Sequence, residues 1–130
     1  MSKSFDELVT IMDRLRAPGG CPWDAEQTYQ SLSQYLIEEA YETFDAIQEA
    51  DQTGDIANLR EELGDLLLQV VFHSTIGKER GDFTIDDVAA GVTQKLILRH
   101  PHVFGDANFA RAEDVLDNWD QLKADERKAS

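Results

Sequence analysis

The sequence has few of the features that hold small proteins together covalently or place them in membranes. Its 130 residues include one cysteine, Cys21, so no disulfide bond can form within the chain. We therefore expect a reducing, cytoplasmic environment. No apolar run exceeds three residues, whereas a membrane span needs roughly 20, and the amino-terminal residues have no apolar signal-peptide core.

Basic residues are also scarce, with 12 Lys and Arg against 26 Asp and Glu and a formal net charge of −14. Nucleic acids and anionic membranes are bound through basic faces that release counterions. This charge balance excludes non-specific binding to either of them. It would also repel a phosphate-bearing ligand unless a cation accompanied that ligand.

The apolar residues recur at helical spacing over almost the whole chain, and no segment alternates as a strand does. The pattern predicts an all-α fold, a helical bundle of about five helices joined by short connections. The expected helices cover residues 4–17, 28–50, 56–78, 85–98 and 112–123.

The chain length is sufficient for one domain, which we expect to cover residues 1–130. Its ordered part is expected to run from about residue 5 to 123, and residues 124–130 are expected to be a polar, frayed tail. Residues 21–27 contain a proline and a tryptophan, and we expect them to form an ordered loop.

The third expected helix has more apolar surface than one small bundle would cover. A central core helix would explain this composition, and so would a helix–helix interface between copies of the chain. We favour the interface, and therefore a homodimer or homotetramer. The apolar residues concerned are Leu63, Leu66, Leu67, Leu68, Val70, Val71 and Phe72.

One group of acidic residues has a spacing that points to chemistry. Glu39 and Glu42 lie three residues apart in the second expected helix, as do Glu62 and Asp65 in the third, so each pair shares a helix face. Positions 39 and 65 are equidistant from position 52, and so are positions 42 and 62. In a long antiparallel helix pair, four carboxylates should therefore meet between the helices.

Carboxylates gathered at a part-buried seam repel one another and lose hydration, so proteins protonate them, pair them with bases or bind a cation. The nearest basic residue, Arg60, is expected on another helix face. Carboxylate oxygens without His or Cys suit Mg²⁺, with Mn²⁺ as the alternative. A solvated acidic face without metal is the other interpretation. A di-iron site is disfavoured, because it requires Glu-x-x-His where this sequence has acids.

Several of the few basic residues gather near the end of the fourth expected helix, namely Lys95, Arg99, His100 and His102. Alone, this pattern favours compensation of the helix dipole. Beside a metal–carboxylate site it also fits a grip on phosphate, to which Lys123 could add charge. Trp23 and Trp119 are candidates for stacking on a nucleobase, and packing in the core or in a lid remains open for both.

Four blocks of the sequence, in order, resemble the MazG family of nucleoside triphosphate pyrophosphohydrolases. The resemblance extends over about residues 5–123 and is nearest to the amino-terminal copy in members that carry two. The blocks are Cys-Pro-Trp-Asp at 21–24 with Gln-Thr at 27–28, Glu-Glu-Ala-Tyr-Glu at 38–42, Glu-Glu-Leu-Gly-Asp-Leu-Leu at 61–67, and Lys-Leu at 95–96 with Arg-His-Pro-His-Val-Phe at 99–104.

The resemblance implies a single all-α domain that assembles into oligomers. It also implies Mg²⁺-dependent cleavage of the α–β phosphoanhydride of (d)NTPs to (d)NMP and pyrophosphate, with clearance of non-canonical nucleotides as an expected role. A catalytically weak nucleotide- or metal-binding regulatory or oligomerisation module of the same fold is the alternative.

At the positions that match the family's motifs, the resemblance implies which residues of this chain form the site. Glu39, Glu42, Glu62 and Asp65 would hold metal, with Glu38 a further ligand or the group that orients water, so that Glu38 and Glu39 are the catalytic candidates. The substrate-binding candidates are Lys95, Arg99, His100, Trp119 and Trp23.

Overall fold

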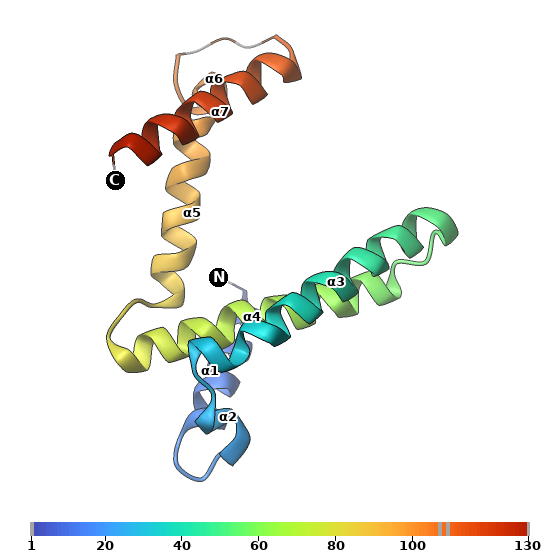
Figure 1. Cartoon of the computed structure of the whole chain (residues 1–130), viewed down its shortest axis with the longest axis vertical. Coiled ribbons are helices and arrows are strands. Elements are labelled where there is room, and N and C mark those ends of the chain that lie inside the picture. The colour runs from blue at the N-terminus through green and yellow to red at the C-terminus, as the bar shows by residue number, and fades with distance from the viewer. Residues whose placement is uncertain (1, 107, 109, 130) are drawn as a thin grey trace. The chain divides into compact units, whose positions relative to one another are not determined.

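The computed structural model describes residues 2–106, 108 and 110–129, and every regular element in that part of the chain is an α-helix (Figure 1). The all-α prediction is confirmed. None of these helices is both long and apolar enough to cross a bilayer. In chain order they are α1 (Lys3–Arg16), α2 (Pro22–Glu26), α3 (Tyr29–Thr53), α4 (Ala57–Arg80), α5 (Ile85–Arg99), α6 (Pro101–Phe104) and α7 (Ala112–Ala129).

Five of these helices correspond to the expected ones, and two short helices are additional. We expected loops at both places, but α2 and α6 each begin at a proline, whose fixed φ angle and missing N–H suit the first helical position. The expected end of the last helix near residue 123 is also wrong. Helix α7 continues to Ala129, because Ala, Glu, Arg and Lys in that segment are good helix formers.

By its contacts the described chain divides into two compact units, Met1–Ile85 and Asp86–Ser130, which are treated separately below. The prediction of a single domain stays a prediction. The first unit is organised around a buried apolar cluster contributed by α1, α3 and α4. Its members are Met12, Leu32, Val71, Phe72 and Ile76.

The guanidinium of Arg16 connects several parts of the first unit. It donates to the carbonyl oxygens of Asp24 at 2.6 Å and Gln27 at 3.0 Å, which hold α2 and its carboxyl-terminal end against α1. It also forms a two-point ion pair with Glu79 of α4, at 2.8 and 3.0 Å. The side chain of Arg16 is almost entirely buried, so these contacts satisfy a charge that would otherwise be costly to bury.

Helices α3 and α4 form the long antiparallel pair that the sequence predicts (Figure 1). Thr28 caps α3: its hydroxyl accepts a hydrogen bond from the backbone N–H of Ser31, and the Ser31 hydroxyl accepts one from the backbone N–H of Thr28, which together form a capping box. Gly54 ends the helix with a φ of 78°, a left-handed conformation that glycine adopts without strain. Asp55 then accepts a hydrogen bond from the backbone of Ala57 at 3.0 Å and starts α4.

The second unit, which contains most of α5 together with α6 and α7, has no fully buried side chain among its described residues. Long polar and aromatic side chains connect its helices instead. Arg99 of α5 forms an ion pair with Glu126 of α7 at 2.6 Å and lies over the ring of Trp119. The edge of His100 packs against the same ring.

Candidate functional site

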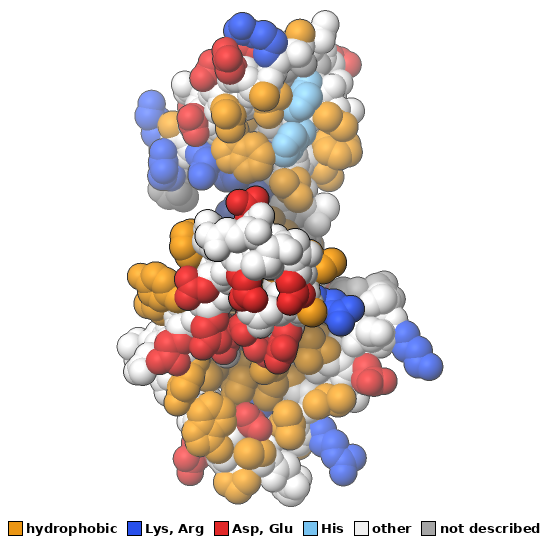
Figure 2. Space-filling view, turned by 90° about the vertical axis from the view of Figure 1, so that its right-hand side faces the viewer, with side chains coloured by type: hydrophobic (Ala, Val, Ile, Leu, Met, Phe, Trp, Pro, Cys, Tyr) orange, Lys and Arg blue, Asp and Glu red, His pale blue; other side chains and the backbone are white. Residues whose placement is uncertain are grey.

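Three carboxylates from facing helices meet along the α3–α4 pair. Glu39 and Glu42 of α3 and Glu62 of α4 each place one carboxylate oxygen within 4.8 Å of the others. Glu42 is exposed, whereas Glu39 and Glu62 are half-buried. Figure 2 shows acidic side chains gathered on this part of the molecule beside hydrophobic ones. We refer to Glu39, Glu42 and Glu62 as the acid cluster.

A buried threonine lies between the two helices at this place and shows their relative height. The Thr43 hydroxyl donates to the carbonyl oxygen of Glu39, one turn earlier in α3, at 2.8 Å. It also lies 3.3 Å from the carbonyl oxygen of Glu62 across the helix pair. The acid-bearing turns of α3 and α4 are therefore level, as the equal spacing about position 52 predicts.

The electrostatics of the acid cluster are unfavourable in the absence of a cation. Loss of hydration raises the pKa of Glu39, and the charges of Glu42, Asp65 and Glu62 raise it further. The pKa of Glu62 is raised by loss of hydration and then by Glu42 and Asp65. Asp65 is not part of the group of three, but its charge acts on both half-buried members.

The acid cluster fits a divalent cation. One oxygen of Glu39 and one of Glu62, Oε2 in each case, are buried without a hydrogen-bond partner. Within the described residues, none of the acids in the cluster forms an ion pair with Lys or Arg. Buried anionic oxygens need compensation, and a set of oxygen donors without His or Cys matches the preference of Mg²⁺ or Mn²⁺.

Glu38 is not brought into the acid cluster, although it neighbours Glu39 in sequence. Its Oε1 accepts a hydrogen bond from the side-chain amide of Gln34, one turn earlier in α3, at 3.1 Å. The carboxylate is exposed. Successive helical residues point about 100° apart, so Glu38 and Glu39 present their carboxylates in different directions.

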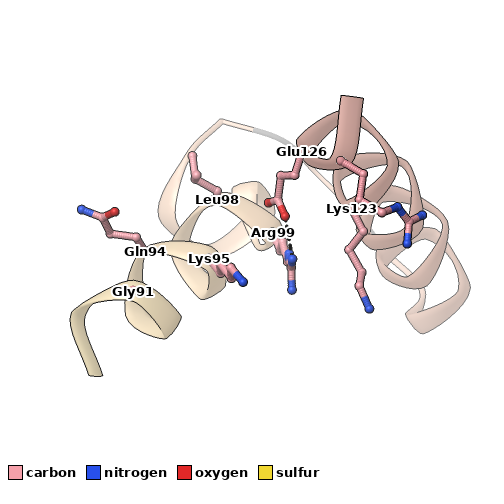
Figure 3. A pocket seen from close by; sticks show the side chains of 8 residues that line it. Gly91, Gln94, Lys95, Leu98, Arg99, Lys123 and Glu126 are labelled. Carbon is pink, nitrogen blue, oxygen red and sulfur yellow. Dashed lines mark hydrogen bonds and ion pairs between the residues drawn. The ribbon is translucent and has the colours of Figure 1, made fainter. Parts of the chain in front are cut away.

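A second candidate site lies in the second unit, between α5 and α7. It is a cavity of about 620 Å³ with four basic residues in its wall (Figure 3), and we call it the basic pocket. The residues of α5 that line the pocket share one face of that helix, and the lining residues of α7 share one face of theirs. The pocket is lined by Gly91, Gln94, Lys95, Leu98 and Arg99 from α5 and by Lys123, Glu126 and Arg127 from α7.

Within the basic pocket, the side chains of Lys95, Arg99 and Lys123 extend towards the same open space (Figure 3). The Arg99 guanidinium is held between two groups. The ring of Trp119 lies 5.2 Å away, and the carboxylate of Glu126 lies 2.6 Å away. Lys95 and Lys123 form no ion pair with any described residue, so their charges are available to an anion.

The aromatic candidates occupy different parts of the chain. Trp119 is half-buried beneath Arg99, with His100 against it at a ring-centroid distance of 5.0 Å. Trp23 belongs to the first unit, is 48% exposed, and meets the ring of Tyr35 edge-on at 5.7 Å. Trp119 is therefore engaged in packing, whereas Trp23 is exposed.

Among the charged residues that line the basic pocket, sequence reasoning missed Glu126 and Arg127. Both fall in the segment that we expected to be a frayed tail. The available signal was their position three and four residues after Lys123, which places all three on one face once the helix continues.

Comparison with known proteins shows which family this sequence matches. The family described as MazG nucleotide pyrophosphohydrolase domain matches residues 27–104, a range that includes the acid cluster, Lys95 and Arg99. It excludes Trp23, Trp119 and Lys123.

Several curated proteins are similar over almost the whole chain. The nucleoside triphosphate pyrophosphohydrolase/pyrophosphatase MazG of Thermotoga maritima is 51% identical over 123 residues, which is 95% of this chain and 45% of that protein. The nucleoside triphosphate pyrophosphohydrolase of Escherichia coli K12 is 48% identical over 124 residues, or 95% of this chain and 46% of that protein. The uncharacterized protein YabN of Bacillus subtilis is 49% identical over 126 residues, which is 97% of this chain and 25% of that protein. The chain thus spans half or less of these relatives.

Proposed function

This chain belongs to the MazG nucleotide pyrophosphohydrolase domain family, and from that membership we propose that it is a metal-dependent nucleoside triphosphate pyrophosphohydrolase. It cleaves the α–β phosphoanhydride of (d)NTPs to (d)NMP and pyrophosphate, with Mg²⁺ as the cofactor and Mn²⁺ as a substitute. Clearance of non-canonical nucleotides is the proposed role. The observation that carries the proposal is the acid cluster, whose buried oxygens on Glu39 and Glu62 have no hydrogen-bond partner.

The proposed metal ligands are the three residues of the acid cluster together with Asp65. Asp65 is included because its charge acts on both Glu39 and Glu62. A divalent ion bound there supplies Lewis-acid polarisation of phosphoryl oxygens and offsets the repulsion between acids and phosphates. The chain contributes the placement of the ligands, which Thr43 secures by holding the two helices level.

The chemical step is an attack of water on the α-phosphorus. The water oxygen forms a bond to phosphorus, the bond to the bridging oxygen breaks, and pyrophosphate leaves. We assign Glu38 to accept a proton from the water. Its Oε1 accepts from Gln34, and the exposed carboxylate has a second oxygen for this purpose. Glu39 is the alternative proton acceptor.

The basic pocket is the proposed phosphate-binding part of the protein. Lys95, Arg99 and Lys123 would bind the phosphate groups of the nucleotide, since positioning and electrostatics dominate phosphoryl transfer. Lys95 and Lys123 form no ion pair with a described residue, and Arg99 forms one, with Glu126. The available positive charge supports this assignment. His100 and Trp119 would border the nucleotide on this side, and Trp23 offers a further stacking surface.

We further propose that the chain assembles into a homodimer or homotetramer in the cytoplasm. The outward face of α3 exposes large apolar side chains, and Ile37, Tyr41 and Phe44 are each 57–69% exposed. With Ala40 they line a hollow of about 370 Å³. Surfaces of this kind usually mark an interface. The same observation favours the alternative function, a catalytically weak oligomerisation or regulatory module.

The activity is tested by incubating the chain with a panel of canonical and modified NTPs and dNTPs plus Mg²⁺. Pyrophosphate and orthophosphate are then measured separately. We expect pyrophosphate without orthophosphate, and none after EDTA treatment. Nucleotide binding without turnover would support the non-catalytic module instead.

Two sets of variants locate the site. Glu42→Gln and Asp65→Asn should each abolish pyrophosphate release with the helical content unchanged, whereas Asp45→Asn, an exposed acid elsewhere on α3, should not. Near-normal turnover in either acid variant would remove the acid cluster from the mechanism. Lys95→Ala should raise KM or lower kcat far more than Lys78→Ala, which breaks only a surface ion pair with Asp13.

A further inference from the structure

The basic pocket contains one carboxylate that the proposed reaction does not use. Oε2 of Glu126 lies 2.6 Å from Nη2 of Arg99, a short charge-assisted contact (Figure 3). The Arg99 side chain is only 12% exposed, and that of Glu126 is 35% exposed. The carboxylate therefore occupies part of the limited accessible surface of the guanidinium, where a phosphate oxygen would bind.

Glu126 is ionised and strongly attracted to its surroundings. The hydrogen bond from Arg99 lowers the pKa of this carboxyl group, and the charges of Arg99, Lys95 and Lys123 lower it further. The carboxylate is thus a resident anion among the same cations that would receive a ligand. An incoming phosphate meets a pocket that is already partly neutralised.

The Arg99 guanidinium has donors to spare in this arrangement. Its Nε is buried without a hydrogen-bond partner in the described chain, and the hydrogen bond to Glu126 uses Nη2. A phosphate group can accept from two guanidinium nitrogens at once, which strengthens binding. The ring of Trp119 lies against the guanidinium, and His100 packs on Trp119 in turn, so the position is preformed before any ligand arrives.

We propose that Glu126 is a built-in competitor for the phosphate groups of the ligand, a carboxylate that must give up Arg99 before a pyrophosphate or triphosphate group can bind it. Glu126 keeps the guanidinium in place while the pocket is empty and lowers the affinity of the pocket for anions. It thereby favours release of pyrophosphate. This inference rests on the proposed function in taking phosphate as the ligand of the basic pocket.

The test measures pyrophosphate binding by titration calorimetry with the full chain, in EDTA, so that neither metal nor turnover enters. Glu126→Gln keeps the size of the side chain and removes its charge. We expect it to bind pyrophosphate on the order of tenfold more tightly than the unmodified chain. Glu126→Asp, which keeps the charge but shortens the reach to Arg99, should show a smaller gain.

The matched control is Asp125→Asn, which removes one negative charge from the neighbouring position. Asp125 accepts from Gln121 at 3.1 Å and does not line the basic pocket. Its substitution should change the affinity less than twofold. An equal gain in both variants would show a general charge effect and overturn the proposal. Circular dichroism of each variant verifies that α7 is intact.

The remaining outcomes separate this inference from the proposed function. If Glu126→Gln binds pyrophosphate no more tightly or more weakly, or if no form of the chain binds it, Glu126 is not a competitor, whatever the hydrolysis assay shows. If Glu126→Gln tightens binding but the chain hydrolyses no nucleotide, the competitor stands and the proposed function fails.

Discussion

The two units of the chain use the same number of basic residues in different ways. Residues 1–85 contain six Lys and Arg and 17 Asp and Glu, a net charge of −11, whereas residues 86–130 contain six and nine, a net charge of −3. In the first unit, Arg16, Lys78 and Arg80 are committed to ion pairs. In the second unit, Lys95 and Lys123 face an open cavity. Both units thus use some basic residues in ion pairs, which in the second unit involve Arg99 and Arg111, but among the described residues only the second unit turns lysines towards a cavity that could take a ligand.

The units also differ in how apolar side chains are covered. The first has a core of fully buried residues, but its α3 also exposes large apolar side chains such as Tyr41, which is 69% exposed. Helix α5 has no buried residue at all. A unit without a buried core derives less stability from the hydrophobic effect. The second unit therefore depends more on its ion pairs, its ring contacts and the proposed assembly.

The largest expected effect tests the difference in burial. Leu32→Ala removes a side chain that is 1% exposed in the first unit, so we expect the free energy of unfolding to fall by about 2–5 kcal/mol. The matched substitution Leu116→Ala, at a residue of α7 that is 62% exposed, should cost less than about 0.5 kcal/mol. Urea unfolding followed by circular dichroism measures both. A comparable loss in the two variants would mean that α7 is covered in solution.

An intermediate effect concerns the acid cluster and pH. The pKa values of Glu39 and Glu62 are raised above the ordinary 4.5, so the folded chain holds protons more tightly than the unfolded chain. This tighter proton binding stabilises the folded chain. The stabilisation is fully present below pH 4.5 and is lost as pH rises through the raised pKa values. Without metal, Glu62→Gln should therefore gain stability relative to the unmodified chain as pH rises.

The control for this prediction is Asp45→Asn, whose stability relative to the unmodified chain should be nearly independent of pH over the same range. Adding Mg²⁺ at a hundredfold excess over its Kd should stabilise the unmodified chain by about 2.7 kcal/mol and Glu62→Gln by less. Thermal unfolding across a pH series, with EDTA or with Mg²⁺, gives both measurements. A variant that shows no pH-dependent gain contradicts the repulsion inferred for the cluster.

The smallest expected effect tests the contact that the Thr43 hydroxyl makes between α3 and α4. Thr43→Val keeps the branched shape and removes the hydroxyl that contacts the carbonyl oxygens of Glu39 and Glu62. A loss of about 1 kcal/mol in unfolding free energy is expected. Thr53→Val removes an exposed hydroxyl that contacts Glu49 and should be nearly neutral. Equal losses in the two variants would show that the contact across the pair contributes nothing.

The helical class and the level of the acids were predictable because both follow from local spacing. A period of 3.6 residues identifies a helix, and equal distances from position 52 set Glu42 opposite Glu62, and Glu39 opposite Asp65, in any antiparallel pair. The two short helices and the length of α7 were not predicted. Short or polar helices lack an extended apolar pattern, so their extent depends on caps and on intrinsic propensity rather than on periodicity.

The sequence by itself determined which residue types face one another along the α3–α4 pair, because helix period and turn position need no knowledge of packing. Only the tertiary structure decided that one oxygen each of Glu39 and Glu62 loses its solvent and that Glu126 contacts Arg99 in the basic pocket. The direction and burial of a side chain depend on the neighbours that pack against it, and those neighbours are distant in sequence.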